Sequence, residues 1–380
     1  MKKNIKKVLF MIKTAYFYLI CLILSLSFPV KAQEQPQIPE DYDPLEEQLK
    51  IEGAYVPNYR ELMRDVIVAL GQYARENKSD FQIIIDGGQE LLTRGEWEND
   101  LDDLHRAEMA GAKTDDERFL LKLFAPEHPI AVGSPIRRYI SIVNGILVTN
   151  QVCSEKTGKL SAGVEKIVKE YGLSLIGVEH CSSDKEKKNA VLTLAEKKIP
   201  VHADTDKTAI FDTVPERSEL FLENPANINS VAKVRNVLML TDTRNFTDKD
   251  LLIKTLSNTN YDLLIVDPFF KSSIPFTKED VKQLQTKKVG AKRLVFAVLN
   301  VAKAQDTRLY WEKGWKQGEP AWLRFQSKTD PSGLIVDYWN PAWKRILGVY
   351  FKSIMELGFD GIVLQGIDEH KTYERIIPIN

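Results

Sequence analysis

Eight short apolar runs, each ending in polar residues, recur along the chain and predict its main elements. In chain order they are Phe81–Asp86, Ser141–Asn150, Ser174–His180, Ile199–Asp204, Asn236–Asp242, Asp262–Asp267, Arg293–Asn300 and Gly361–Ile367. Continuous apolar runs, as opposed to alternating ones, are typical of parallel strands that helices cover on both faces. The pattern therefore predicts eight buried strands in an α/β protein.

Helical patterns lie between these runs. Residues 58–77 carry apolar side chains at spacings of three and four, and Thr277 is followed by early acids in the manner of a capped helix. Asn340 and Pro341 predict the start of a further helix, and Gly358 predicts its end. Strand–helix alternation repeated eight times predicts a (β/α)₈ TIM barrel. The alternative is an open doubly wound sheet, although no phosphate-binding glycine fingerprint follows any of the strands.

The order of the predicted elements is helix first and strand last. Such a barrel closes if the helix at residues 58–77 packs outside the final strand, Gly361–Ile367, in place of the helix that this strand lacks. A ring can be cut at any loop where its two ends stay close and exposed. The sequence therefore predicts a circularly permuted (β/α)₈ barrel.

The N-terminal residues differ from the rest of the chain. Five lysines between residues 2 and 13 precede an apolar run from Ala15 to Val30, which predicts a signal peptide over residues 1–32. A retained membrane anchor is the alternative, but the run is shorter than the ~20 residues that a span requires. Residues 33–57, rich in Pro and Glu, predict a flexible linker, and 58–380 a single barrel domain. We therefore expect a secreted or periplasmic protein without stable membrane insertion after cleavage.

Composition and charge narrow the function only slightly. The chain is 43% hydrophobic with a formal net charge of −1, which is ordinary for a globular protein and gives no indication of nucleic-acid binding. His180, His202 and His370 show no metal-ligand spacing, so neither a metal nor another cofactor is expected. Cys153 and Cys181 follow the predicted leader, and the sequence leaves open whether they pair.

Candidate catalytic groups come from the ends of the predicted strands, where barrel enzymes carry their reactive residues. The acids chosen there are Asp86, Glu179, Asp267 and Asp368. Two carboxylates that face each other across a cleft can hydrolyse a glycosidic bond. The alternative for each acid alone is a turn former or a helix cap.

Aromatic residues supply a second candidate feature. Five of the six tryptophans fall between residues 311 and 343, after the strand that ends at Asn300. Flat rings stack on sugar faces while polar groups bind the hydroxyls, so the predicted substrate-binding residues are Asn300, Tyr310, Trp311, Trp322, Tyr338, Trp339 and Gln365. The alternative is that the rings only pin this loop to the barrel, which we favour for Trp343 in the first turn of a helix.

Four motifs resemble one known family. The segments Asp306–Trp311 (DTRLYW), Glu319–Leu323 (EPAWL), Val336–Trp343 (VDYWNPAW) and Gly358–Asp368 (GFDGIVLQGID) are similar to glycoside hydrolase family 114. The resemblance implies a secreted (β/α)₈ enzyme of the endo-α-1,4-polygalactosaminidase type. The N-terminal half of the chain resembles the second half of the family's barrel, which agrees with a circular permutation.

The chain also departs from the family pattern. Gln365 stands where the family has an acid, residues 302–305 (AKAQ) replace an acidic run, and Thr149 lies near the position of an expected glutamate. Asp267, Asp306, Asp360 and Asp368 match the pattern, although Asp360 precedes its strand and is expected to be structural. Losing a general acid or base lowers a rate by about 10²–10⁴-fold.

Three functional hypotheses follow from these observations. The first is a hydrolase of an extracellular amino-sugar polysaccharide with a rearranged pair of acids. The second is an inactive protein of the same fold that binds such a glycan, and the third is a scaffold whose barrel mouth is merely polar.

Overall fold

The computed structural model describes residues 56–125, 128–154, 160–205, 211–215, 222–326, 333–376 and 379. These residues belong to one compact unit, Leu45–Asn380. The predicted signal peptide (1–32) and all but two residues of the predicted linker (33–57) lie outside the described residues, so both stay predictions.

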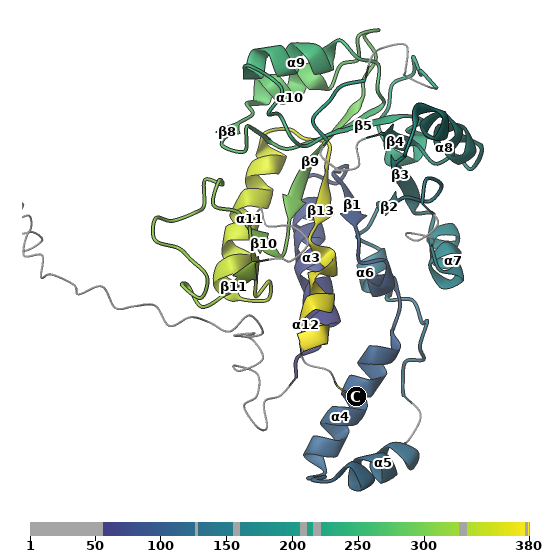
Figure 1. Cartoon of the computed structure of the whole chain (residues 1–380), viewed down its shortest axis with the longest axis vertical. Helices are drawn as coiled ribbons and strands as arrows, with labels where there is room; N and C mark the ends of the chain where they lie inside the picture. Colours follow the sequence, from purple (N-terminus) through teal and green to yellow (C-terminus); the bar gives the residue numbers. More distant parts are fainter. Residues whose placement is uncertain are drawn as a thin grey trace, which may run out of the picture. The chain divides into compact units, whose positions relative to one another are not determined.

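Eight parallel strands form a nearly closed barrel (Figure 1). They are β1 (Gln82–Asp86), β2 (Gly145–Thr149), β3 (Ser174–His180), β4 (Val201–Asp204), β5 (Val237–Leu240), β6 (Leu263–Val266), β9 (Leu294–Asn300) and β13 (Gly361–Gln365). Each strand pairs with the next one along the chain except at the junction of β4 and β5, and β13 pairs with β1. All eight predicted strands are confirmed. The open doubly wound sheet is wrong, because β4 and β5, the two edge strands of this order, also lie against each other.

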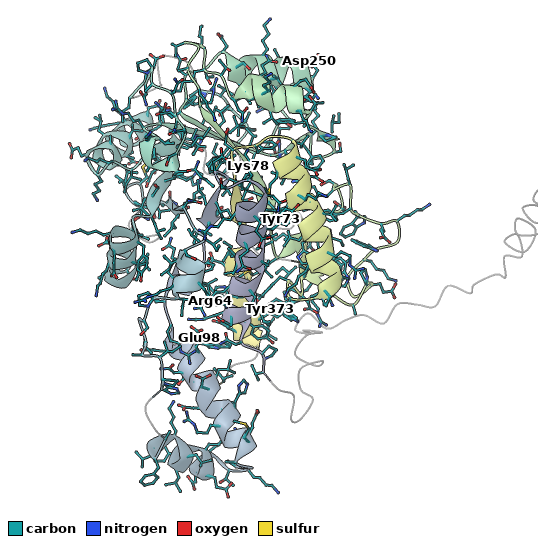
Figure 2. The ribbon with its side chains drawn as sticks, turned by 180° about the vertical axis from the view of Figure 1, so that it is seen from behind. Arg64, Tyr73, Lys78, Glu98, Asp250 and Tyr373 are labelled. Carbon is teal, nitrogen blue, oxygen red and sulfur yellow. A yellow bond between two sulfur atoms is a disulfide. The ribbon has the colours of Figure 1, made fainter. Side chains whose placement is uncertain are left out.

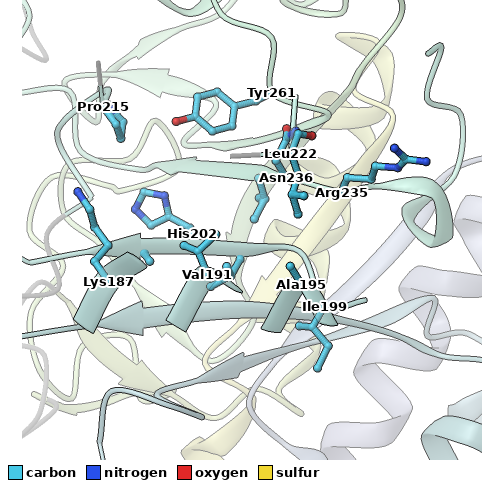
Figure 3. A pocket seen from close by; sticks show the side chains of 13 residues that line it. Lys187, Val191, Ala195, Ile199, His202, Pro215, Leu222, Arg235, Asn236 and Tyr261 are labelled. Carbon is cyan, nitrogen blue, oxygen red and sulfur yellow. The ribbon is translucent and has the colours of Figure 1, made fainter. Parts of the chain in front are cut away.

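The junction between β4 and β5 is the seam of the barrel. The backbone N–H of Met239 reaches across it to Nδ1 of His202 at 3.5 Å, in place of a strand ladder. Figure 3 shows the small cavity beside this seam, with His202, Asn236 and Tyr261 among its lining residues. Its volume of about 40 Å³ has room for no more than a few water molecules.

The core has two layers because successive strand residues face opposite sides of the sheet. Ile84, Val178, Ile265, Phe296 and Val363 belong to the cluster inside the barrel. The residues that follow them on the strands pack with the helices in the outer cluster, for example Ile85, Val266, Ala297 and Leu364. The same alternation directs Asp86, His180, Asp267, Asn300 and Gln365 toward the barrel interior at the strand ends, and directs Glu179 outward.

Helices and 3₁₀ turns surround the strands. They are α3 (Tyr59–Asn77), η1 (Gln89–Leu92), α4 (Glu96–Met109), α5 (Asp115–Leu123), α6 (Arg137–Ile140), α7 (Ala162–Tyr171), α8 (Asp184–Glu196), η3 (Val231–Lys233), α9 (Lys249–Ser257), α10 (Lys278–Leu284), α11 (Pro341–Glu356), η4 (Ile367–Glu369) and α12 (His370–Ile376). The predicted caps are confirmed, since the side chains of Thr277 and Asn340 each accept a backbone N–H of the first turn. Asn58 caps α3 in the same way. Gly358, with φ of 96°, follows the end of α11 as predicted.

Helix α3 joins the two ends of the barrel. It packs against α6, against α11, which precedes β13, and against α12, which follows η4. Lys78 at its C-terminal end donates to the carbonyl oxygen of Phe359 at 2.7 Å. Figure 2 shows Arg64, Tyr73 and Lys78 spaced along this helix, with Tyr373 of α12 near its other end.

One part of the predicted element order is wrong. The strand β13 is not the last element, because η4 and the seven-residue helix α12 follow it. The pattern of α12 was missed because a helix of two turns carries too few apolar positions for its periodicity to stand out.

Two long segments at the C-terminal ends of strands carry additional structure that the sequence did not predict. The segment after β1 contains η1, α4, α5 and α6. The segment between β9 and α11 contains a three-stranded antiparallel sheet of β10 (Lys303–Ala304), β12 (Leu334–Val336) and β11 (Leu323–Gln326). A hairpin of β7 (Phe269–Phe270) and β8 (Ile274–Pro275) follows β6.

Candidate functional site

A cleft of about 690 Å³ lies at the C-terminal ends of β6, β9 and β13. The segment after β9 forms one wall, so the predicted loop does line the barrel mouth. The lining residues are Phe211, Thr241, Asp242, Arg244, Asp267, Ser272, Val298, Leu299, Asn300, Lys303, Gln305, Asp306, Thr307, Arg308, Tyr310, Trp311, Gln326, Gly333, Leu334, Tyr350 and Gln365. Amides, hydroxyls and aromatic rings dominate this set, which is a composition suited to sugars.

Asn300 and Gln365 lie side by side in the floor of the cleft, because β9 and β13 pair in a register that matches these two residues. The amide oxygen of Asn300 accepts the backbone N–H of Ala302 at 3.1 Å. Gly366 follows with φ of 76°, and a Cβ there would lie 2.2 Å from that same oxygen. The close approach therefore requires glycine, and it fixes the amide of Asn300 in the cleft.

Asp86 is held beside Gln365 rather than in the cleft lining. The Nε2 group of Gln365 donates to Oδ2 of Asp86 at 3.0 Å. Burial raises the pKa of Asp86; the hydrogen bond from Gln365 lowers it by less, and the charge of Asp368 raises it further. Asp86 is therefore an acid that holds its proton to higher pH than an ordinary aspartate.

Asp267 is fully engaged by an arginine that the sequence analysis missed. Its two carboxylate oxygens accept from Nη1 and Nη2 of Arg308 at 2.8 and 2.7 Å, and Oδ1 also accepts the backbone N–H of Phe269 at 2.9 Å. Burial lowers the pKa of Arg308, but the hydrogen bond and charge of Asp267 outweigh it and leave this pKa raised. The pair is nearly buried, with side chains 10% and 7% exposed. Both oxygens of Asp267 are thus engaged by Arg308, which limits the access of a sugar to this carboxylate.

The other two candidate acids lie elsewhere. Glu179 is completely buried and faces away from the barrel interior. Its carboxylate accepts hydrogen bonds from the backbone N–H groups of Gln151, Val152 and Cys153, at 2.6, 3.1 and 2.9 Å respectively. It therefore anchors the loop after β2, and Cys153 in that loop forms a disulfide with Cys181.

Asp368 lies in η4 with its side chain 53% exposed. Its Oδ1 atom accepts the backbone N–H of Gly88 at 3.1 Å and pairs with Lys371 at 2.6 Å. These bonds tie the segment after β13 to the segment after β1. Asp360 is structural as expected, since its Oδ2 atom accepts the backbone N–H of Val295 at 3.0 Å.

The aromatic residues that were predicted to bind substrate divide into those that line the cleft and those that pack elsewhere. Tyr310 and Trp311 line the cleft, and the hydroxyl oxygen of Tyr310 accepts the backbone N–H of Gln305 at 3.1 Å. Trp322 is 6% exposed and packs against Trp315 and Trp343.

The remaining two rings pack beside α3 instead of lining the cleft. Tyr338 is 0% exposed and donates its hydroxyl proton to the carbonyl oxygen of Tyr59 at 2.8 Å. Trp339 lies within 5.4 Å of the Tyr59 ring and 4.8 Å of the Tyr373 ring. Trp343 is buried and donates to the carbonyl oxygen of Val301 at 2.8 Å. It therefore holds this segment against the barrel, as predicted for Trp343.

A histidine–aspartate cluster occupies the ends of β3 and β4. Nδ1 of His180 lies 3.0 Å from Oδ1 of Asp204, and Nε2 of His202 lies 3.6 Å from Oδ2. Burial raises the pKa of Asp204, but hydrogen bonds from the two imidazoles outweigh this and leave it well below its usual value. Phe211 contacts both imidazole rings and also lines the cleft. Strand alternation does place His180 inside the barrel, but no pattern in the sequence indicates that Asp204 contacts both histidines.

The charges of the cleft are close to balanced. Arg308 pairs with Asp267, and Arg244 pairs with Asp242. Lys303 is 5% exposed with its amino group 4.0 Å from Glu369, while Asp306 is exposed at the cleft. Within the described ranges, no group of three His, Cys, Asp or Glu side chains is arranged to hold a metal ion. No helix in the described part of the chain combines the length and apolar character needed to cross a bilayer.

Comparison with known proteins gives partial relatives without assigned functions. No protein-family model matches the chain. An uncharacterized protein of Deinococcus radiodurans is 30% identical over 122 residues, which cover 32% of this chain and 38% of that protein. Uncharacterized proteins of Methanocaldococcus jannaschii and Thermotoga maritima are 28% and 29% identical over 40% and 30% of this chain. The matches span only 43% and 34% of those two relatives.

Proposed function

We propose that this protein binds an extracellular amino-sugar polysaccharide in the cleft, without hydrolysing it. The observation that carries this proposal is the state of the acids. Asp267 is neutralised by two hydrogen bonds from Arg308, and Gln365 holds an amide where the resembling family has an acid. A glycosidase needs two carboxyl groups facing the bond that breaks. Of the three acids that line this cleft, Asp242 and Asp267 are each paired with an arginine.

The resemblance to glycoside hydrolase family 114 supports the choice of ligand. The motif at residues 306–311 contributes Asp306, Arg308, Tyr310 and Trp311 to the cleft wall. Polygalactosamine-type chains offer hydroxyls and partly acetylated amines to such a wall. The ring of Trp311, half-buried against Trp315 at 5.5 Å, is the candidate stacking surface for a sugar.

We further propose that the chain is a circular permutation of that family's barrel. In support, the segment that resembles the family's second half forms β1 to β4, and β13 pairs with β1 through residues 82–85 and 361–364. A secreted or periplasmic location belongs to the same proposal. The Cys153–Cys181 disulfide supports it, because disulfides persist in oxidising compartments.

The binding experiment uses two tryptophans with different places in the structure. The purified protein, Trp311→Ala and Trp339→Ala would be titrated with oligosaccharides from partially deacetylated galactosaminogalactan in a calorimeter. We expect Trp311→Ala to weaken binding at least about five-fold, since a well-stacked ring contributes on the order of 1 kcal/mol beyond its buried area. Trp339→Ala is the control, because that ring packs between Tyr59 and Tyr373. Equal affinities for all three proteins would contradict this use of the cleft.

Hydrolysis is the second candidate function. It is favoured by the contact of Asp86 with Gln365, which lines the cleft, together with the raised pKa of Asp86. A carboxyl group that keeps its proton can act as a general acid, and exposed Asp306 is then the available base. Incubation of the protein with the same polysaccharide, followed by chromatography of the products, separates the two functions. Oligosaccharides released by the parent but not by Asp86→Asn would establish hydrolysis, and binding without products would establish the proposed function.

A further inference from the structure

Helix α5 presents an apolar stripe that nothing in the described part of the chain covers. None of its residues is buried. The stripe consists of Phe119, Leu120, Leu123 and Phe124, which are 63%, 50%, 61% and 80% exposed. Positions separated by one, four and five residues share one face of a helix, so these four side chains form a continuous surface.

The stripe faces away from the neighbouring helix α4. Lys122 and half-buried Leu121 lie on other sides of α5, and the amino group of Lys122 pairs with Asp100 of α4 at 2.9 Å. At the other end of α4, the carboxylate of Glu98 pairs with Arg64 of α3, a contact that can be followed in Figure 2. The α4–α5 pair is thus attached through α4, and the α5 stripe is left for another surface.

The size of the stripe is large for a monomer's helix. If each of the four side chains presents ~200 Å² when free, their exposed fractions correspond to roughly 500 Å² on this helix. Patches of this size mark interaction sites in soluble proteins. Two such faces together bury roughly 1,000 Å², which is at the lower end of specific, reversible interfaces.

The order of residues in the stripe identifies the partner. Read in either direction, the stripe residues within 119–124 give Phe-Leu-x-x-Leu-Phe, where x stands for Leu121 and Lys122. A two-fold axis brings residue i of one copy against residue j of the other and j against i. With an axis between residues 121 and 122, Phe119 meets Phe124 of the second copy and Leu120 meets Leu123. We propose that the α5 stripe is the contact surface for a second copy of this chain, in an antiparallel two-fold dimer.

Charge argues against a membrane as the occupant. The first turn of α5 consists of Asp115, Asp116 and Glu117, beside the stripe. Anionic lipid surfaces attract basic segments and repel acidic ones. In the antiparallel pair, the dipoles of the two helices oppose each other, which is the favourable arrangement for side-by-side helices.

Sedimentation velocity of the purified full chain between about 1 and 100 µM tests the proposal. We expect a reversible, concentration-dependent shift to twice the mass of one chain. Leu120→Glu alone and Leu123→Lys alone should each remain monomeric, because each buries a charge against leucine. The double variant should dimerise again, because Glu at 120 then meets Lys at 123 of the other copy twice. Val349→Glu, at a 64% exposed position of α11, is the control that should dimerise as the parent does.

Several outcomes would overturn the proposal. They are a parent that stays monomeric at 100 µM, single variants that still dimerise, or a double variant that remains monomeric. Flotation of a monomeric parent with phosphatidylcholine–phosphatidylglycerol vesicles, lost in Leu120→Glu, would assign the stripe to a membrane instead.

Discussion

The Asp267–Arg308 pair offers the sharpest test of how the cleft is built. The perturbation is a double-mutant cycle of Asp267→Asn, Arg308→Met and both together. Two charge-assisted hydrogen bonds of 2.8 and 2.7 Å join side chains that are nearly removed from water. Breaking a buried ion pair by removing one partner destabilises a protein by about 3–5 kcal/mol, because the other charge stays buried.

The two single variants should differ. Arg308→Met leaves the carboxylate of Asp267 with one donor, the N–H of Phe269, so we expect a loss of about 3–5 kcal/mol in the free energy of unfolding. Asp267→Asn leaves Arg308 bonded to Gln305 and stacked 5.2 Å from the Phe269 ring, so we expect a smaller loss of about 2–3 kcal/mol. The double variant should lose less than the two losses combined, by at least about 2 kcal/mol.

Urea unfolding followed by tryptophan fluorescence measures all four proteins at neutral pH. Additive losses within about 0.5 kcal/mol would refute the inference that the pair acts as one unit. Stability unchanged in Asp267→Asn, combined with a loss of glycan hydrolysis, would assign Asp267 to catalysis and contradict the proposed function.

Three further predictions concern groups around the cleft. The pKa of Asp86 is raised in the folded state, so the folded state holds this proton more tightly than the unfolded chain does, and the stability of the parent falls as pH rises above about 3.8. Asp86→Asn should remove this fall in stability. Urea unfolding at several pH values should show the variant as stable as, or more stable than, the parent at neutral pH. The pKa of Asp204 is lowered in the folded state, so the stabilisation from its ionised carboxylate is fully present above about pH 3.8 and is lost as pH falls below that value. Asp204→Asn should therefore show a shallower acid unfolding transition than the parent, as measured by circular dichroism. An identical transition would contradict the His180 contact. Gly366→Ala should weaken glycan binding and lower the free energy of unfolding by about 1–3 kcal/mol, because the added methyl would displace the amide of Asn300. Unchanged affinity in calorimetry together with unchanged stability in urea unfolding would contradict the close approach of Gly366 to Asn300.

The fold was more predictable than the site, for a physical reason. Buried parallel strands require continuous apolar sequence, so runs such as Phe81–Asp86 and Arg293–Asn300 could be read within one or two residues of the observed β1 and β9. The closure by α3 followed from helix periodicity and from the count of strands. Neither argument applies to β10, β11 and β12, which are too short to carry a period.

The site depended on pairings between residues that are far apart in the chain. The sequence placed Asp86 and Gln365 at the ends of predicted strands, but their hydrogen bond joins residues 279 positions apart. Arg308 pairs with Asp267 across 41 positions, and no local pattern marks either residue as the other's partner. Among the aromatic residues, composition alone did not separate Trp311 at the cleft from Trp322 in the core, because that separation is set by tertiary packing.

The Asp86–Gln365 pair shows what an amide at residue 365 contributes to the arrangement of this cleft. An amide at residue 365 donates a hydrogen bond to Asp86 at any pH, whereas a carboxyl group there donates one only while it holds a proton. Gln365→Glu would place two acids in contact, so that one of them keeps its proton with a strongly raised pKa. That variant is therefore the direct route to a general acid in this cleft. If the variant releases oligosaccharides and the parent does not, the barrel retains the rest of a glycosidase site. If the variant binds the polysaccharide without release, Arg308 and the engaged Asp267 are sufficient to prevent hydrolysis.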